Sequence, residues 1–181
     1  MSFSQDGWSY KVKWGDELLL TKRTGPGFGE LTIPETLVKD GRTYRVTLGE
    51  RILKGCAGPI YLTLPESLDN IGEYAFEGCS GLSSIRIPAA VTSIKSHAFE
   101  GCTGLTSIAI PPSVVNIGVC SFKGCTNLSS IDIPDSVNCV DFWTFEECSG
   151  LTAVTLPDSL VSIGKEAFRG CASLRSVTVR G

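Results

Sequence analysis

The chain has 181 residues, with 16 Lys and Arg against 19 Asp and Glu, so its formal net charge is −3. This acidic balance argues against nucleic-acid partners and against binding to an anionic membrane surface. No apolar run reaches the ~18 residues of a membrane-spanning helix, and the first residues lack the apolar region of a signal peptide. We therefore expect no membrane insertion, and no signal peptide in this chain.

The first 30 residues do not repeat. In residues 8–14, apolar residues alternate with polar ones, which predicts a strand. Residues 17–21 (ELLLT) predict its partner, across the turn dipeptide Gly15-Asp16. We expect residues 1–30 to form a β-hairpin cap, because the apolar end of a stacked array would otherwise face water. The alternating residues are Trp8, Tyr10, Val12 and Trp14.

From residue 56 onward, three kinds of residue recur every 23 positions. A fixed period of this length indicates one supersecondary unit stacked on copies of itself, since each unit is too small to bury a core alone. The recurring residues are Pro65, Pro88, Pro111, Pro134 and Pro157; Phe76, Phe99, Phe122, Phe145 and Phe168; and Cys56, Cys79, Cys102, Cys125, Cys148 and Cys171.

Each unit begins with a predicted short strand in which residues such as Ile85 and Ile87 point inward. Pro88 ends this strand, because proline has no backbone N–H to donate. A second apolar stretch follows at Val91 and Ile94. We expect a right-handed stack of about six coils, with a parallel β-sheet on one face and short irregular or helical segments on the other.

The stretch 31–56 predicts an irregular first unit. Pro34 precedes Pro65 by 31 residues, eight more than the period, and the surplus falls in the turn-rich run 39–43. Leu53 stands where the later units have Phe. This degeneracy is typical of an end coil, which packs on one side only. At the other end, the chain stops directly after a predicted strand, which indicates either a fragment or an edge covered by a partner.

The unit pattern L-x-x-I-x-I-P-x-x-V-x-x-I-G-x-x-A-F-x-x-C resembles the BspA-like class of leucine-rich repeats over residues 31–181. The resemblance implies a leucine-rich-repeat solenoid at 31–181 behind the cap at 1–30, together forming a single structural domain. It also implies a bacterial or protist surface or secreted protein, and several members are adhesins toward host matrix proteins or other cells. The family has no catalytic residues to carry over.

The six periodic cysteines occupy one equivalent position per unit, which favours a role as small buried hydrophobic residues. Disulfides between neighbours are disfavoured because parallel, like-oriented side chains rarely meet the dihedral requirement. Zinc is disfavoured because ligands in a row cannot form a tetrahedron. Cys120 and Cys139 lie outside the register, and their reactivity stays open.

We expect no catalytic site, no cofactor and no metal site. His97, the only histidine, has no nucleophile motif beside it, which disfavours a catalytic base. Its column varies between units, which is typical of a solvent-facing position. Four carboxylates are interpreted as solvated surface charges: Asp132, Asp135, Asp141 and Asp158.

Two surfaces are candidates for partner binding. The first is the outer face of the predicted sheet, where short polar side chains would let a partner approach closely; the alternative is an ordinary solvated sheet. Its candidate residues are Tyr61, Arg86, Asp132 and Thr155.

The second candidate surface lies in the irregular unit VNCVDFWTFEEC, where two aromatic residues replace variable polar ones. Exposed aromatic patches often mark partner sites. The alternative is that Trp143 folds over the coil edge and shields the core. The candidate patch is Val119, Cys120, Phe142 and Trp143.

Together these features predict a non-enzymatic protein-binding or adhesion module of a secreted or cell-surface protein, with a cytoplasmic location left open. The expected partner is a protein, such as a host matrix or cell-surface protein. Self-association through the aromatic patch or the uncapped C-terminal edge is also considered. The alternatives are a structural spacer, an accessory domain of a larger protein, or a host-directed effector.

Overall fold

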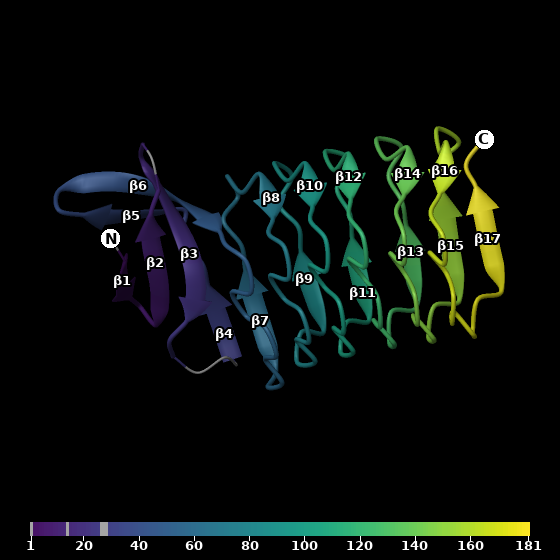
Figure 1. The fold of residues 1–181 in the computed structure, drawn as a ribbon, viewed down its shortest axis with the longest axis horizontal. Coiled ribbons are helices and arrows are strands. Elements are labelled where there is room, and N and C mark those ends of the chain that lie inside the picture. Colours follow the sequence, from purple (N-terminus) through teal and green to yellow (C-terminus); the bar gives the residue numbers. More distant parts are fainter. Residues whose placement is uncertain (1, 14, 26–28) are drawn as a thin grey trace.

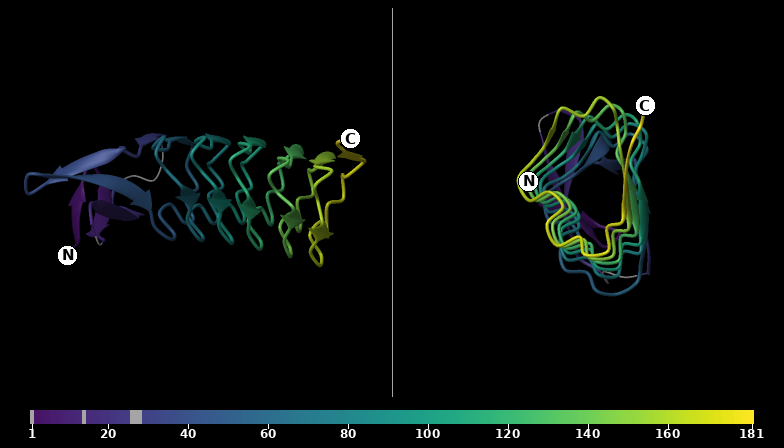
Figure 2. Two further views of the ribbon diagram at one scale, coloured as in Figure 1. Left: turned by 90° about the horizontal axis from the view of Figure 1, so that it is seen from above. Right: turned by 90° about the vertical axis from the view of Figure 1, so that its right-hand side faces the viewer.

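The structure, a computed structural model, describes residues 2–13, 15–25 and 29–181. An N-terminal sheet is followed by an elongated stack of coils, with the chain termini at opposite ends (Figure 1). When the stack is viewed along its axis, successive coils superpose (Figure 2). This repetitive stack is what the 23-residue period predicts.

The N-terminal sheet contains five strands in the order β1-β2-β3-β6-β5. β2 and β3 pair antiparallel, as the alternating pattern predicts, and they bury Trp8 and Tyr10. β3 also pairs in parallel with β6, so the sheet extends beyond residue 30. Trp14, expected in the first strand, lies outside the described residues. The strands are β1 (Ser2–Gln5), β2 (Trp8–Val12), β3 (Glu17–Arg23), β5 (Thr36–Lys39) and β6 (Arg42–Leu48).

The surplus residues of the first unit account for this larger sheet. Asp40 and Gly41 both have positive φ, 51° and 75°, and they connect β5 to β6 as an antiparallel hairpin. Two consecutive residues with positive φ form the turn that matches the twist of paired strands. The turn-rich run therefore adds a hairpin to the cap, where the sequence alone predicted only a turn.

Beyond the cap, each coil contributes one strand to a parallel ladder along one face. Equivalent residues pair one repeat apart, as Ser107 pairs with Ser84 and Ile108 with Ile85. In β9 the central Ile85 is buried and its two neighbours are exposed, so the predicted alternation is confirmed. The strands are β4 (Gly29–Thr32), β7 (Ile60–Thr63), β9 (Ser84–Arg86), β11 (Ser107–Ala109), β13 (Ser130–Asp132), β15 (Ala153–Leu156) and β17 (Ser176–Val179), paired as β4–β7, β9–β11 and β13–β15–β17.

A second parallel ladder forms at the second apolar stretch, where the sequence did not predict strands. Its strands have only two residues each, and their apolar members, such as Ile94, point into the core in all but the last strand, where Ile163 is 50% exposed. They are β8 (Asn70–Ile71), β10 (Ser93–Ile94), β12 (Asn116–Ile117), β14 (Cys139–Val140) and β16 (Ser162–Ile163), paired as β8–β10–β12 and β14–β16.

Turns make up the remaining side of each coil. The described residues contain no helix, so the helical alternative for this side is wrong. The cause is a pair of left-handed residues four positions apart in each coil, such as Tyr74 (φ 54°) and Gly78 (φ 69°), which interrupts a helical hydrogen-bond ladder. Alternate amides instead bond between coils: the N–H groups of Tyr74, Phe76 and Gly78 donate to the carbonyls of Ser96, Ala98 and Glu100.

The core is a column of stacked rings flanked by a column of thiols. The rings of Phe99 and Phe122 are 5.3 Å apart at 7°, and those of Phe122 and Phe145 are 5.4 Å apart at 7°. Five of these thiols, from Cys79 to Cys171, each donate a hydrogen bond to a carbonyl of the preceding coil, as Cys125 Sγ does to Phe99 O at 3.2 Å. All eight cysteines are free. Burial raises the pKa of Cys102 to about 12, so this thiol stays protonated.

Leu53 corrects one expectation. It occupies the position of the later phenylalanines, since its carbonyl accepts the thiol hydrogen bond of Cys79. Although the sequence placed it in an end coil packed on one side, its exposed fraction is only 2%. The cap covers this coil, because the Arg23 N–H bonds to Ile52 O at 3.2 Å. Leu53 therefore lies inside a continuous core.

Candidate binding surfaces

The outer face of the strand ladder contains a row of three shallow hollows. The first has a volume of about 480 Å³ and lies between β4, β7 and β9. Tyr61 on β7 lines it and is 67% exposed. Arg86, on the same rim, forms an ion pair with Glu66 of the preceding coil. Two of the four sheet-face candidates therefore lie at one hollow.

The other two hollows continue along the same face. The second has a volume of about 770 Å³, and Ser84, Ser107 and Ala109 lie along it. The third, of about 490 Å³, is lined in part by Ala109 and Asp132. These hollows exist because the outward strand positions carry short side chains, so the backbone of the sheet lies close to the surface. The predicted small, polar face is therefore present.

Arg180 lies at the rim of the third hollow and alters the interpretation of two carboxylates. Its guanidinium pairs with both Asp132 and Asp135, which lie two coils earlier in the chain. The hydrogen bond to Asp135 raises the pKa of Arg180. The sequence predicted that Asp132 and Asp135 are solvated surface charges. In the structure, both instead form ion pairs with Arg180. Thr155, the fourth candidate, is half-buried in the coil between them.

The His97 column has a geometry that the sequence did not reveal. Every residue in it has a left-handed backbone, although none is glycine. Such φ values are uncommon for non-glycine residues and impose a local strain. The column comprises Arg51, Tyr74, His97, Cys120, Trp143 and Glu166, with φ of 57°, 54°, 59°, 55°, 55° and 58°.

Side chains of this column stack on one another. The guanidinium of Arg51 lies 4.3 Å from the ring centroid of Tyr74, which stacks on His97 at 4.4 Å. His97 Nδ1 lies 2.6 Å from Glu100 Oε2. The expectation of a plain solvent-facing column is wrong, since these rings are half-buried. Within the described residues, His97 contacts the ring of Tyr74 and the carboxylate of Glu100, and neither contact supplies a serine or cysteine nucleophile.

The irregular unit places its two aromatic residues differently. Phe142 is 48% exposed, whereas Trp143 is half-buried and donates from Nε1 to Glu166 Oε2 at 3.1 Å. Glu166 also pairs with Arg169, which pairs with the buried Glu146. Trp143 is therefore tied into a polar network with Glu166, Arg169 and Glu146.

Cys120 does not lie in an exposed patch. Its exposed fraction is only 6%, because its short side chain sits in the column between the larger His97 and Trp143. Burial raises the pKa of its thiol. Val119 is half-buried, so Phe142 is the most exposed member of the predicted patch. Cys139 is the exposed cysteine, and it accepts a hydrogen bond from Ser162.

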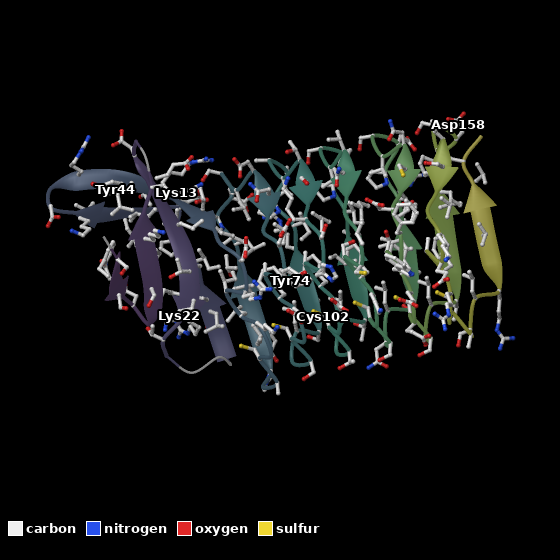
Figure 3. All side chains as sticks on the ribbon, viewed as in Figure 1. Lys13, Lys22, Tyr44, Tyr74, Cys102 and Asp158 are labelled. Carbon is white, nitrogen blue, oxygen red and sulfur yellow. The ribbon has the colours of Figure 1, made fainter. Side chains whose placement is uncertain are left out.

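The two remaining carboxylates agree with the expectation of surface positions in part. Asp158 is exposed and lies near the C-terminal end of the stack (Figure 3). Asp141 Oδ1 accepts the backbone N–H of Phe142 at 2.8 Å and so has a local structural role.

Within the described ranges, no group of three or more His, Cys, Asp or Glu could hold a metal ion. Those ranges also contain no helix that is long and apolar enough to cross a membrane.

Comparisons with solved structures identify leucine-rich-repeat relatives. A Treponema pallidum leucine-rich-repeat protein is 25% identical, with a TM-score of 0.76, and the match covers 98% of this chain and 82% of that one. A leucine-rich cell surface protein from Faecalibacterium prausnitzii is 24% identical with a TM-score of 0.71; the match covers 99% of this chain and 54% of that one. The pneumococcal vaccine antigen PcpA is 16% identical with a TM-score of 0.51, and the match covers 99% of this chain and 48% of that one.

The chain thus spans about half the length of the Faecalibacterium protein, whose match supports the fold alone. No curated protein sequence matches the chain. At the family level, residues 46–175 match the BspA type leucine rich repeat region in six copies. These copies cover most of the coils described above and most of the residues that line the hollows of the strand face. The chain belongs to the BspA-type leucine-rich repeat family.

Proposed function

We propose that this chain is a non-enzymatic protein-binding module that contacts its partner through the outer face of the strand ladder. The observation that carries the proposal is the row of three hollows along that face. Repeat stacks generally bind macromolecules on such extended faces. The family supports the class of function, since leucine-rich-repeat domains generally mediate protein–protein interaction.

The residues of this face suit a docking surface. Tyr61 is a large, exposed side chain with a polar tip, a residue type enriched among interface anchors. Beside it, short side chains such as Ser84 and Ala109 leave room for the side chains of a partner. Arg86 and Asp132 add one charge of each sign along the face. The predicted sheet-face candidates thus supply an anchor and polar contacts.

The aromatic patch is a smaller, second contact in this proposal. Phe142 has the exposure needed to enter a partner's pocket, and Trp143 and Val119 surround it at half-buried positions. Cys120 would support the patch from below, since it is itself buried. Self-association through Phe142 is the simplest use of such a contact in the isolated chain.

A binding assay with matched variants tests the main surface. Purified host matrix proteins are immobilised, and binding of the wild type is compared with that of a Tyr61→Ser, Arg86→Ser double variant. A Lys165→Ser variant serves as the control, because Lys165 is exposed and lies on a turn of the stack rather than on the strand face. We expect the double variant to lose binding and the control to keep it. Equal binding by all three proteins would refute the sheet face as the docking surface.

The proposed setting is the cell surface or the extracellular space. A Faecalibacterium protein with a similar fold is named as a cell surface protein, and the proposal carries this setting over to the present chain. Protease treatment of intact source cells, followed by immunoblotting with an antibody to the chain, tests it. Loss of the signal without lysis is expected, whereas a fully protected signal would contradict surface display.

A further inference from the structure

Both ladders are interrupted between the same two coils. Within the described residues, β11 pairs with β9 but not with β13, and β12 pairs with β10 but not with β14. The wide step between β12 and β14 is visible in Figure 1. The two coils stay joined along their turns, where the Phe122 N–H donates to Thr144 O at 2.9 Å. The stack is therefore loosened between these coils on its ladder sides.

The interruption exposes side chains of β11 that belong to the core in neighbouring coils. Ile108 and Ile110 are half-buried, whereas the equivalent residues one coil earlier, Ile85 and Ile87, are buried. Their equivalents one coil later are buried as well. Partly exposed apolar side chains favour binding when a ligand covers them, because apolar surface is removed from water. The coil of β11 is therefore better suited to be covered by a partner than its two neighbours.

The third hollow of the strand face lies at this interruption. Its volume is about 490 Å³, and its lining is more apolar than polar. Ala109, Ile110 and Pro112 line it from the coil before the interruption. Asp132 and Asp135 line it from the coil after the interruption. The hollow therefore combines an apolar wall with two carboxylates.

Negative charge is in excess at this hollow. Asp158, which is exposed, occupies the position equivalent to Asp135 one coil later. Three carboxylates and one guanidinium give a local charge of −2; they belong to Asp132, Asp135, Asp158 and Arg180. Arg180 binds Oδ1 of both Asp132 and Asp135, and within residues 29–181 Oδ2 of these carboxylates has no hydrogen-bond or ion-pair partner. Arg175 precedes β17 and so lies at the opposite end of that strand from Arg180.

The other two hollows of the strand face lack this excess. The second has one charged residue among the described residues that line it, Arg86, which pairs with Glu66. The first is lined by Glu30 and Arg86, one charge of each sign. The excess of negative charge therefore coincides with the interruption of the ladders at the third hollow.

We propose that the third hollow receives a lysine or arginine side chain from an extended, basic segment of the partner protein. This inference rests on the proposed function, because it specifies the chemistry of the partner that the strand face binds. Lysine and arginine cover apolar surface with their long stems while their charged heads stay at a polar rim. Here the stem lies along Ile110 and Pro112, and the head binds the carboxylates of Asp132 and Asp135, which accept strong charge-assisted hydrogen bonds.

Arg180 supports this assignment from within the chain. Its guanidinium pairs with both carboxylates at once, so the pair already accepts a basic head group. A neutral or acidic segment would leave the excess negative charge of the hollow without compensation, and like charges across an interface disfavour binding.

Fluorescence anisotropy with three labelled decapeptides tests the proposal. The peptides alternate Thr with Lys, Thr with Gln or Thr with Glu, so that they share length and an extended tendency but differ in charge. The test variants are Asp132→Asn, Asp135→Asn, which removes both carboxylates, and Ala109→Arg, which places a cation in the hollow from an exposed position. The control variant is Asp16→Asn, Asp40→Asn, which removes the same charge from exposed positions of the cap. Thermal melting of each variant confirms that it is folded.

We expect the wild type to bind the Lys peptide at least about tenfold more tightly than the Gln peptide, and the Glu peptide most weakly. Both test variants should bind the Lys peptide at least about tenfold more weakly than the wild type, because charge-assisted contacts are lost or opposed. The control variant should stay within about twofold of the wild type, since its charges lie far from the hollow and are screened by salt.

The proposal is overturned if the wild type binds none of the peptides, or binds the Gln peptide as tightly as the Lys peptide. It is also overturned if the test and control variants lose affinity equally, since that would be a general charge effect. The matrix-protein assay with the Tyr61→Ser, Arg86→Ser variant gives the proposed function a separate readout. If that assay supports the strand face and the peptides fail, only the basic partner segment is refuted; if both fail, the strand face itself is refuted.

Discussion

Truncation of a central ring offers the sharpest test of how the stack is stabilised. Phe122 has an exposed fraction of 0% and stacks on Phe99 and Phe145, at 5.3 and 5.4 Å. A buried Phe→Ala change costs ~3–5 kcal/mol, and each aromatic stack adds ~0.5–1.5 kcal/mol to simple burial. Since both faces of the ring are covered, we expect Phe122→Ala to fall at the upper end, about 4–5 kcal/mol.

Phe168 is the matched comparison in the same column. It is only half-buried, and within the described residues its ring stacks on one other ring, that of Phe145, at 5.3 Å. With less burial and one stack fewer, Phe168→Ala should cost about 2 kcal/mol.

Urea unfolding followed by circular dichroism measures both free energies of unfolding. Hydrogen exchange of coil amides then tests whether the loss is local, since neighbouring coils in a repeat protein contribute separately to stability. A cost below about 1 kcal/mol for Phe122→Ala would refute the core assignment, because no fully buried ring is that dispensable. Equal costs for the two variants would refute the account based on stacking from both sides.

The remaining predictions concern the thiols, the left-handed backbone and the aromatic patch. Burial raises the pKa of Cys102 and Cys148 from 9.0 to about 12, so between about pH 9 and 12 these thiols ionise only in the unfolded chain. The free energy of unfolding should therefore fall as the pH rises through this range. In denaturant titrations, a Cys102→Ala, Cys148→Ala variant should show a shallower fall. Glu147→Gly should stabilise the chain by about 1 kcal/mol, because Glu147 has φ 59° where the equivalent coils have glycine; a lower melting temperature would contradict this. Phe142→Ser changes a surface residue and should alter the free energy of unfolding by no more than about 0.5 kcal/mol. Trp143→Ser should lower the free energy of unfolding by more, because it leaves Glu166 without the indole N–H. Equal melting curves for the two variants would refute that distinction.

Much of the fold follows from the repeat itself. Ile85 and Ile87 point inward because strand side chains alternate, and the prolines end each strand because they have no N–H to donate. The phenylalanine and cysteine columns are buried in the central coils because each unit can cover them only with its neighbours, whereas Cys56, Phe168 and Cys171 at the ends stay half-buried. These properties repeat in every coil, so a single sequence displays them several times. The free, buried cysteines were predictable for the same reason.

The second ladder and the missing helices depend on contacts between coils. Two-residue strands such as β10 carry no local strand signal. They form only because the adjacent coil places its backbone groups in position to pair with them. The left-handed column is invisible in the sequence, since Tyr74 or His97 would not adopt positive φ in isolation. The inter-coil hydrogen bonds of the turns hold these residues in that conformation.

The candidate sites divide in the same way. The sequence by itself determined which residues face outward from the strand ladder, because alternation places Tyr61 and Arg86 there. Only the tertiary structure decided that Cys120 is buried and that Arg180 reaches Asp132 two coils away. The physical reason is that side-chain burial and charge clustering depend on distances between coils and between the cap and the stack, which no spacing within a single unit encodes.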